Sequence, residues 1–100
     1  MTYFITHHVK LETIEVLGDY HSMKILLLLH ENGTTMRSIV YAMIPSSSNT
    51  LKIRLDNLLE SGLISEKEEK FPPKRKWVEL TKKGERVAEH LLAIQKILSE

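Results

Sequence analysis

The chain of 100 residues suits one small domain, and its 42% hydrophobic and 27% charged residues are typical of a folded globular protein. It contains no cysteine, which excludes disulfides, thiolate metal sites and cysteine redox chemistry. The formal net charge is only +1, with three Lys/Arg against four Asp/Glu in residues 1–50 and eleven against nine in residues 51–100. The whole chain therefore attracts a polyanion weakly, and any nucleic-acid contact must depend on where the basic residues lie.

The ends and apolar runs of the chain give no sign of a membrane segment. The first ten residues, MTYFITHHVK, lack the charged start, apolar stretch and small-residue cleavage site of a signal peptide. The longest apolar run, residues 25–29, is far shorter than the roughly 18 residues that a membrane span needs. We therefore expect a cytoplasmic protein without a membrane partner.

The first predicted helix covers residues 12–30. Apolar residues recur there at helical spacing, and Asn32-Gly33 supplies a stop signal. Its buried stripe is expected to comprise Ile14, Leu17, Ile25, Leu28 and Leu29.

A short second helix is predicted over residues 36–43. Thr34 or Thr35 is expected to cap its N-terminus through the side-chain hydroxyl. Pro45 and the serines at 46–48 end it, because proline cannot continue a helix. Its apolar face is expected to be Ile39, Val40 and Met43.

The third predicted helix, residues 49–60, has the clearest helical pattern in the chain. Its apolar stripe follows the 3.6-residue period and comprises Leu51, Leu55, Leu58 and Leu59. Ser61-Gly62 ends it, since glycine suits the left-handed conformation that often follows a helix.

A β-hairpin and a last helix follow. Residues 63–70 and 77–81 read as its two strands, and the stretch EKFPPKRKW that joins them carries a proline pair that stiffens the loop. Thr81 is expected to cap the last helix, whose stripe is Val87, Leu91, Ile94 and Leu98. This order predicts a winged helix-turn-helix: a mainly α fold with a small β-hairpin, in the order helix-helix-helix-wing-helix, as a single domain over residues 1–100.

The outward face of the third helix is the first candidate for contact with double-stranded DNA. The leucine stripe leaves Asn49, Thr50, Ile53, Asp56 and Asn57 on the opposite side. A solvated helix face is the ordinary alternative, but helix N-termini attract phosphate and Ile53 suits a thymine methyl group. Arg54 and Ser47 are expected on phosphates. The residues expected nearest the bases are Ser48, Asn49, Thr50, Lys52 and Ile53.

The hairpin tip is the second candidate. Lys74, Arg75 and Lys76 stand together without an acid at positions 70–76, and such a tip suits a minor groove or flanking phosphates. The alternative is a solvated charge run. Acidic residues count against DNA binding unless they face away from it, and they are Asp56, Glu66, Glu68 and Glu69.

No constellation in the sequence supports an enzyme, a metal site or a cofactor. Neither an H-x-x-x-H spacing nor a serine paired with a base occurs. The five histidines leave a metal site open only across a dimer interface.

The last helix has too many apolar residues for one monomer face. Val87, Leu91, Ile94 and Leu98 are expected to pack inward, which leaves Leu92 and Ile97 for a partner. A symmetric homodimer buries such a patch against itself. Alternatively, residues 3–5 fold back over it. The expected dimer interface comprises Leu91, Leu92, Ile94, Ile97 and Leu98.

Over about residues 12–98 the chain resembles the HxlR-type winged-helix transcriptional regulators, within the wider MarR/ArsR group. The resemblance is carried by LGDYHSMKILLLL, NTLKIRLDNLLESGLI and FPPKRKWVELTKKG. It implies a dimeric DNA-binding regulator, with dimer contacts from terminal helices and DNA contacts from the third helix and the wing. Relatives commonly carry a cysteine near the start, where His8 stands here, so thiol sensing is excluded.

These observations predict a homodimer that binds double-stranded DNA and regulates transcription. The alternative is a protein–protein interaction module of the same fold with little DNA affinity. Operator sequence, effector ligand and the sign of regulation are not written in the sequence.

Overall fold

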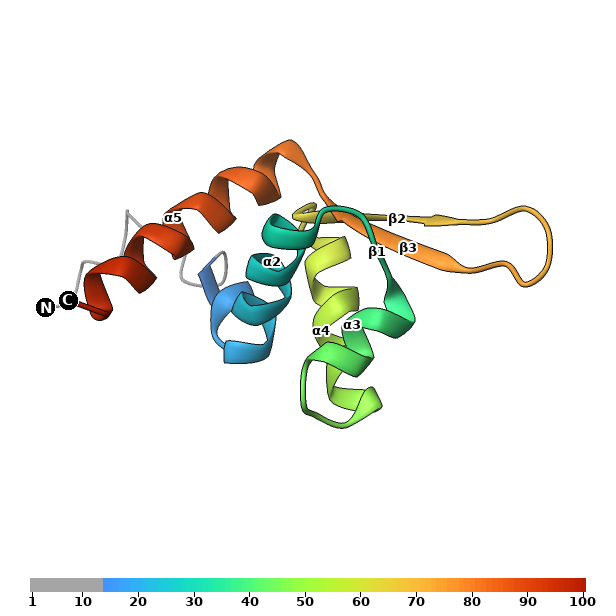
Figure 1. Ribbon diagram of the computed structural model, residues 1–100, viewed down its shortest axis with the longest axis horizontal. Helices are drawn as coiled ribbons and strands as arrows, with labels where there is room; N and C mark the ends of the chain where they lie inside the picture. The colour runs from blue at the N-terminus through green and yellow to red at the C-terminus, as the bar shows by residue number, and fades with distance from the viewer. Residues whose placement is uncertain (1–13) are drawn as a thin grey trace, which may run out of the picture.

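The structure, a computed structural model, describes residues 14–100 and confirms the winged helix-turn-helix fold (Figure 1). A cluster of helices is followed by a hairpin that projects from one end of the molecule, while the last helix runs toward the other end. The elements are η2 (Glu15–Leu17), α2 (Tyr20–Asn32), β1 (Thr35–Met36), α3 (Arg37–Met43), α4 (Ser48–Glu60), β2 (Ile64–Glu68), β3 (Lys76–Leu80) and α5 (Lys82–Leu98).

The predicted first helix is divided in two, so its expected continuity is wrong. A short 3-10 turn, η2, ends at Gly18, and α2 begins only after Asp19. Asp19 has extended backbone, and its carboxylate accepts a hydrogen bond from the backbone N–H of His21 at 2.7 Å. A short acidic side chain that bonds the backbone in this way starts a new helix rather than continuing an old one. Ile14, expected in the buried stripe, is 62% exposed, and residues 12–13 lie outside the described residues.

The threonine cap predicted for the second helix is also wrong. Thr35 lies in strand β1, buried, with its hydroxyl donating to the carbonyl of Gly33 at 2.8 Å. Met36 takes the cap position of α3 without a side-chain hydrogen bond. Strand pairing decides this, because Thr35 is aligned with Val78 of β3. Of the apolar face expected for this helix, Val40 is buried, whereas Ile39 and Met43 are largely exposed.

The three strands form one antiparallel sheet in the order β1-β3-β2. The predicted hairpin is confirmed, with Ile64 opposite Leu80 at its base and Glu68 opposite Lys76 near its tip. Strand β1 was not predicted, because two residues carry no readable alternation. It completes the sheet beside β3 and ties the start of α3 to the hairpin.

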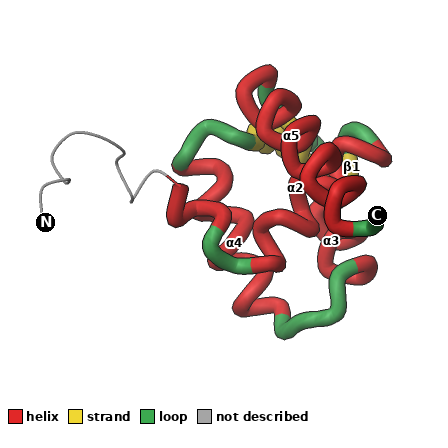
Figure 2. The backbone as a smooth tube through the Cα atoms, turned by 90° about the vertical axis from the view of Figure 1, so that its left-hand side faces the viewer, coloured by secondary structure: helices red, strands yellow, loops and turns green. Residues whose placement is uncertain are grey.

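The core lies where α2, α4 and α5 meet the sheet, and Figure 2 shows these helices gathered in front of the strands. The leucine stripe of α4 is confirmed, with Leu51, Leu55 and Leu58 fully buried and Leu59 partly buried. The helix ends as predicted, with Gly62 in the left-handed region at φ 79°. Buried side chains from the rest of the chain complete the core: Ile25, Leu26, Leu29, Val40, Ile44, Leu63, Ile64, Val78 and Ala88.

Helix α5 packs on the core only through its first half. Its predicted cap is confirmed, since the hydroxyl of Thr81 accepts a hydrogen bond from the backbone N–H of Gly84 at 3.0 Å. The last turns of α5 extend away from the other helices (Figure 1). The expected inward packing of Ile94 and Leu98 is therefore wrong, since their side chains are 52% and 79% exposed. Leu92, expected to be exposed, is half-buried. No helix within residues 14–100 is both long and apolar enough to cross a bilayer.

The close approach of α5 to the hairpin generates a stability prediction. A Cβ added at Gly84 would lie 1.9 Å from the backbone carbonyl oxygen of Leu63, so Gly84→Ala must push the two elements apart. We expect the free energy of unfolding in urea to fall by roughly 1–3 kcal/mol, as for other overpacked sites. The exposed neighbour Lys83 supplies the control, since Lys83→Ala should change it by less than about 0.5 kcal/mol. Equal stability of the two variants would contradict the close approach.

Candidate nucleic-acid interface

The N-terminus of α4 presents short polar side chains. Ser47 caps the helix: its hydroxyl oxygen accepts from the backbone N–H of Thr50 at 3.1 Å and donates to the hydroxyl of Thr50 at 2.9 Å. Ser48 and Asn49 are exposed, and Thr50 is half-buried. The first turn of the helix therefore offers backbone N–H groups and hydroxyls, a combination that suits anions such as phosphate.

The outward face continues with Lys52 and Ile53. Both are exposed, and the exposed fraction of Ile53 is 45%. The leucine stripe that anchors α4 lies on the other side of the helix, so these side chains are held in place without taking part in the core. The structure thus brings together five of the predicted base-reading residues on one helix, namely Ser48, Asn49, Thr50, Lys52 and Ile53.

Arg54 is placed differently from the rest of the predicted set. Its Nη2 atom lies 3.1 Å from Oδ2 of Asp19, the residue that caps α2, and the side chain is 30% exposed. Its Nε atom is buried and has no hydrogen-bond partner among residues 14–100. Arg54 therefore fastens α4 to the start of α2, and a phosphate contact by the same side chain stays a prediction.

The acidic residues that counted against DNA binding are mostly paired with cations. Asp56 contacts Lys52 at 3.1 Å and Arg37 at 3.3 Å, and Glu66 contacts Arg37 at 2.5 Å. The hydrogen bond from Lys52, reinforced by Arg37, lowers the pKa of Asp56, although its partial desolvation acts the other way. Arg37 was not among the predicted site residues, because a lone arginine in a short helix carries no sequence signal.

The hairpin tip, which we call the wing, comprises residues 69–76 and projects away from the helices (Figure 1). The backbone N–H of Lys74 donates to the carbonyl of Phe71 at 2.9 Å, and Lys74 has a positive φ of 52°. Phe71 is 77% exposed in this tight turn, which the sequence analysis did not anticipate. The tip therefore combines an exposed aromatic ring with the predicted basic residues Lys74, Arg75 and Lys76, all exposed.

Glu69 organises the base of the wing. Its carboxylate accepts a hydrogen bond from Nε1 of Trp77 at 3.0 Å and pairs with Arg75 at 3.3 Å. The bond from Trp77 lowers the pKa of Glu69 most, the backbone and side chain of Arg75 add to the effect, and partial desolvation opposes it. Arg75 thus forms an ion pair within the wing while its side chain stays 50% exposed. Lys74 and Lys76 form no ion pair with a described residue.

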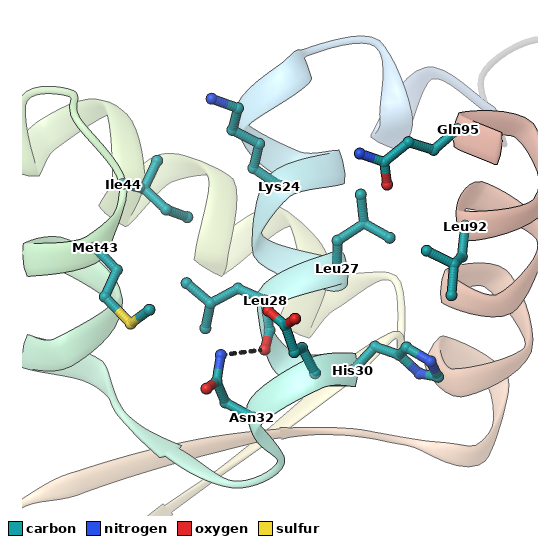
Figure 3. Close-up of a pocket in the computed structure, with 10 residues that line it drawn as sticks. Lys24, Leu27, Leu28, His30, Asn32, Met43, Ile44, Leu92 and Gln95 are labelled. Atoms are coloured by element: carbon teal, nitrogen blue, oxygen red, sulfur yellow. Dashed lines mark hydrogen bonds between the residues drawn. The ribbon is translucent and has the colours of Figure 1, made fainter. Parts of the chain in front are cut away.

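A groove of about 580 Å³ lies between α2, α5 and the end of α3 (Figure 3). Leu27, Leu28 and Met43 form its apolar wall, and Leu92 closes it from α5. His30 stands at its edge and contacts Glu85 of α5. Leu92, predicted for a dimer interface, therefore belongs to this groove in the single chain.

Within residues 14–100 the histidines do not form a cluster. His21 pairs with Asp19 and His30 pairs with Glu85, each with one carboxylate. Over residues 14–100 no three His, Asp or Glu side chains come close enough to hold a metal ion. His7 and His8 lie outside the described residues, and the metal site considered across a dimer interface stays untested.

Comparison with known proteins relates this chain to a family of helix-turn-helix proteins. A family model described as HxlR-like helix-turn-helix matches residues 16–100. Among curated protein sequences, none matches the chain significantly.

Solved structures share the fold at low sequence identity. The ytfH protein of Salmonella typhimurium, described as a proposed transcriptional regulator, superposes with a TM-score of 0.81 at 20% identity, over 98% of this chain and 88% of that one. A proposed MarR-family regulator from Porphyromonas gingivalis W83 gives 0.77 at 20% identity, over 94% and 98%. Overoxidized AbfR, solved bound to DNA, gives 0.63 at 23% identity, over 82% and 61%.

The cap at Asp19 generates a pH prediction. The backbone N–H of His21, and further the His21 ring and Arg54, lower the pKa of Asp19 below its usual 3.8, although partial desolvation opposes them. A carboxylate with a lowered pKa in the folded state stabilises the fold above about pH 4, and this stabilisation is lost as the pH falls through the lowered value. We expect Asp19→Asn, which still caps a helix, to lose less stability than wild type between about pH 6 and pH 3.

Urea unfolding at each pH measures this difference. Asp19→Ala removes the cap as well as the charge, so it should be less stable than Asp19→Asn even at the upper pH. Parallel pH profiles for wild type and Asp19→Asn would show that the charge of Asp19 does not stabilise the fold.

Proposed function

Because the chain belongs to the HxlR-like helix-turn-helix family, we propose that it regulates transcription as a homodimer that binds double-stranded DNA through α4 and the wing. The observation that carries the proposal is the two-sided character of α4. Three fully buried leucines anchor one side, while a capped, polar N-terminus and Lys52 face solvent on the other. A helix held in this way enters a major groove with its N-terminal residues toward the base edges.

In this arrangement each group has a distinct task. Ser48, Asn49 and Thr50 reach hydrogen-bonding groups on base edges, and Lys52 reaches a guanine or a phosphate. Ile53 contacts a thymine methyl group. Ser47 and the first-turn N–H groups hold a phosphate, and Arg54 does likewise if it leaves Asp19.

The wing supplies the second contact, with the minor groove or the flanking phosphates. Lys74, Arg75 and Lys76 are exposed there, and Phe71 stands beside them. Apolar side chains at such tips wedge against minor-groove walls, while the neighbouring lysine and arginine side chains attract the phosphates. The tight turn between Phe71 and Lys74 holds the tip in one shape before DNA arrives.

Homodimerisation through α5 is proposed from its exposed apolar end. Ile94, Ile97 and Leu98 are 52%, 63% and 79% exposed and lie within two turns of one helix. Leu91 and Leu92, the other predicted interface residues, are half-buried, and Leu92 lines the groove against α2, so its part in the interface stays a prediction. A two-fold partner covers the exposed apolar end and sets two recognition helices at matching half-sites about 34 Å apart.

One observation favours a second candidate function, a protein–protein interaction module. Ile53 and Phe71 are both large, apolar and exposed, and each suits a protein partner as well as DNA. Weak DNA affinity without salt dependence would favour this candidate.

The wing prediction concerns the salt dependence of DNA binding. Replacing Lys74, Arg75 and Lys76 together by alanine should weaken binding to a random-sequence duplex. The slope of log affinity against log salt should become shallower by about 2 to 3 for each wing, hence by about 4 to 5 for the proposed dimer. Fluorescence anisotropy of a labelled duplex at several salt concentrations measures both quantities. Phe71→Ala should lower the affinity at every salt concentration and leave the slope unchanged.

A charge-matched control separates local from overall electrostatics. Alanine at Lys24, Lys83 and Arg86, exposed positions on α2 and α5, removes the same charge away from the wing. An equal loss of slope in both triple variants would show that the wing makes no special contact. Absence of binding by wild type at low salt would reject DNA binding itself.

The dimer prediction concerns Ile97. Sedimentation velocity of wild type at micromolar concentration should give the mass of two chains, and Ile97→Asp should give the mass of one, because it places a charge in an apolar contact. Ser99→Asp adds the same charge at an exposed site on the same end and should remain dimeric. A monomeric wild type, or a dimeric Ile97→Asp, would refute this interface.

A further inference from the structure

Arg37 stands at the junction of three elements. It opens α3, and its side chain is only 13% exposed. Each of its three guanidinium nitrogens contacts a different residue: Nε lies 3.1 Å from the hydroxyl of Tyr41, Nη1 lies 2.5 Å from Glu66 of β2, and Nη2 lies 3.3 Å from Asp56 of α4. One side chain thus joins α3, the recognition helix and the first strand of the hairpin.

These contacts also settle the charges beside α4. Asp56 shares its carboxylate between Arg37 and Lys52, whereas Arg37 is the only cation within ion-pair distance of Glu66 among the described residues. Burial by itself lowers the pKa of Arg37, but the hydrogen bonds to Tyr41 and Glu66 more than offset this, so the pKa lies above its usual value. Arg37 therefore stays charged, and together with Lys52 it balances two carboxylates that would otherwise repel phosphate.

The geometry separates Arg37 from an ordinary phosphate contact. A guanidinium is a rigid planar fork, and here all of its nitrogens already have protein partners. Lysine carries the same charge on one nitrogen. Its three N–H groups therefore start from a single point and cannot span three partners placed around a planar guanidinium. Shape, and not charge alone, is what this position requires.

We propose that Arg37 is a positioning residue for DNA recognition. It locks α4 against β2, so that the recognition helix and the wing meet DNA in one fixed arrangement, and together with Lys52 it balances the charges of Asp56 and Glu66 at that face. The proposal rests on the DNA binding proposed above. It assigns Arg37 a role through its two carboxylate partners and no direct contact with DNA.

A double-mutant cycle tests the proposal. Arg37→Met and Arg37→Lys are made in the wild-type chain and again in a chain that carries Asp56→Asn and Glu66→Gln. Affinity for the random-sequence duplex is measured across a salt series for all six proteins. Far-ultraviolet circular dichroism and the fluorescence of Trp77, the single tryptophan, report whether each protein is folded.

In the wild-type background both substitutions should weaken DNA binding on the order of tenfold, since removing one member of a coupled charge network leaves the others uncompensated. In the neutral background Arg37→Met should change affinity by only about twofold, because no carboxylate remains to be masked. Arg37→Lys is the sharper test, because it keeps the charge and should still weaken binding in the wild-type background.

Three outcomes would overturn the proposal. Equal losses for Arg37→Met in both backgrounds, with a shallower salt slope, would make Arg37 a direct phosphate contact. Full binding by Arg37→Lys would reduce its role to charge. Unchanged binding by both variants would leave it a structural residue. If Arg37→Met does not fold in the wild-type background, Arg37→Lys in the two backgrounds decides alone. Failure of wild type to bind DNA at low salt would instead reject the proposed function.

Discussion

Leu51, Leu55 and Leu58 are fully buried against the core that α2 shares with α4, and this contact sets the direction of every other side chain on α4. A helix with one stripe locked inward has its opposite side fixed as well, because side chains repeat every 3.6 residues. The polar first turn and Lys52 are therefore presented outward by packing alone. Arg54, on the flank of the stripe, is drawn instead to Asp19 and adds an ionic link between the same two helices.

Electrostatics then works at the level of single pairs. A net charge of +1 gives the protein almost no overall attraction to DNA, so the local balance of each surface matters. Asp56, Glu66 and Glu69 all lie near the candidate interface, and each is held by a cation or a hydrogen-bond donor. Lys74 and Lys76 are exposed and form no ion pair with a described residue. The pairing of the acids, rather than an excess of bases, makes this face compatible with phosphate.

The two ends of the molecule divide the proposed tasks. The wing projects from one end and the apolar half of α5 from the other, with the core between them (Figure 1). The tight packing of Gly84 on the carbonyl of Leu63 holds α5 directly against the base of the hairpin. In the proposed homodimer, a change in the relative position of the two α5 helices would thus be passed to the hairpins through this close contact. His30, at the edge of the groove between α2 and α5, contacts Glu85, the residue that follows Gly84.

The sequence by itself determined the elements whose pattern is local and repeated. The leucine stripe of residues 49–60, the cap at Thr81, the glycine after the third helix and the two long strands were all correctly predicted, because each depends on neighbours a few residues away. The strand at Thr35 and the exposure of Ile94 and Leu98 were not, since they depend on what lies opposite in space. The break at Asp19 was missed although its signal is local, a carboxylate that bonds the backbone N–H of His21. Only the tertiary structure showed which charged residues meet beside α4. Arg37 contacts Asp56 and Glu66, which lie 19 and 29 residues further along the chain. Local sequence spacing does not encode which distant charged residues come into contact after folding.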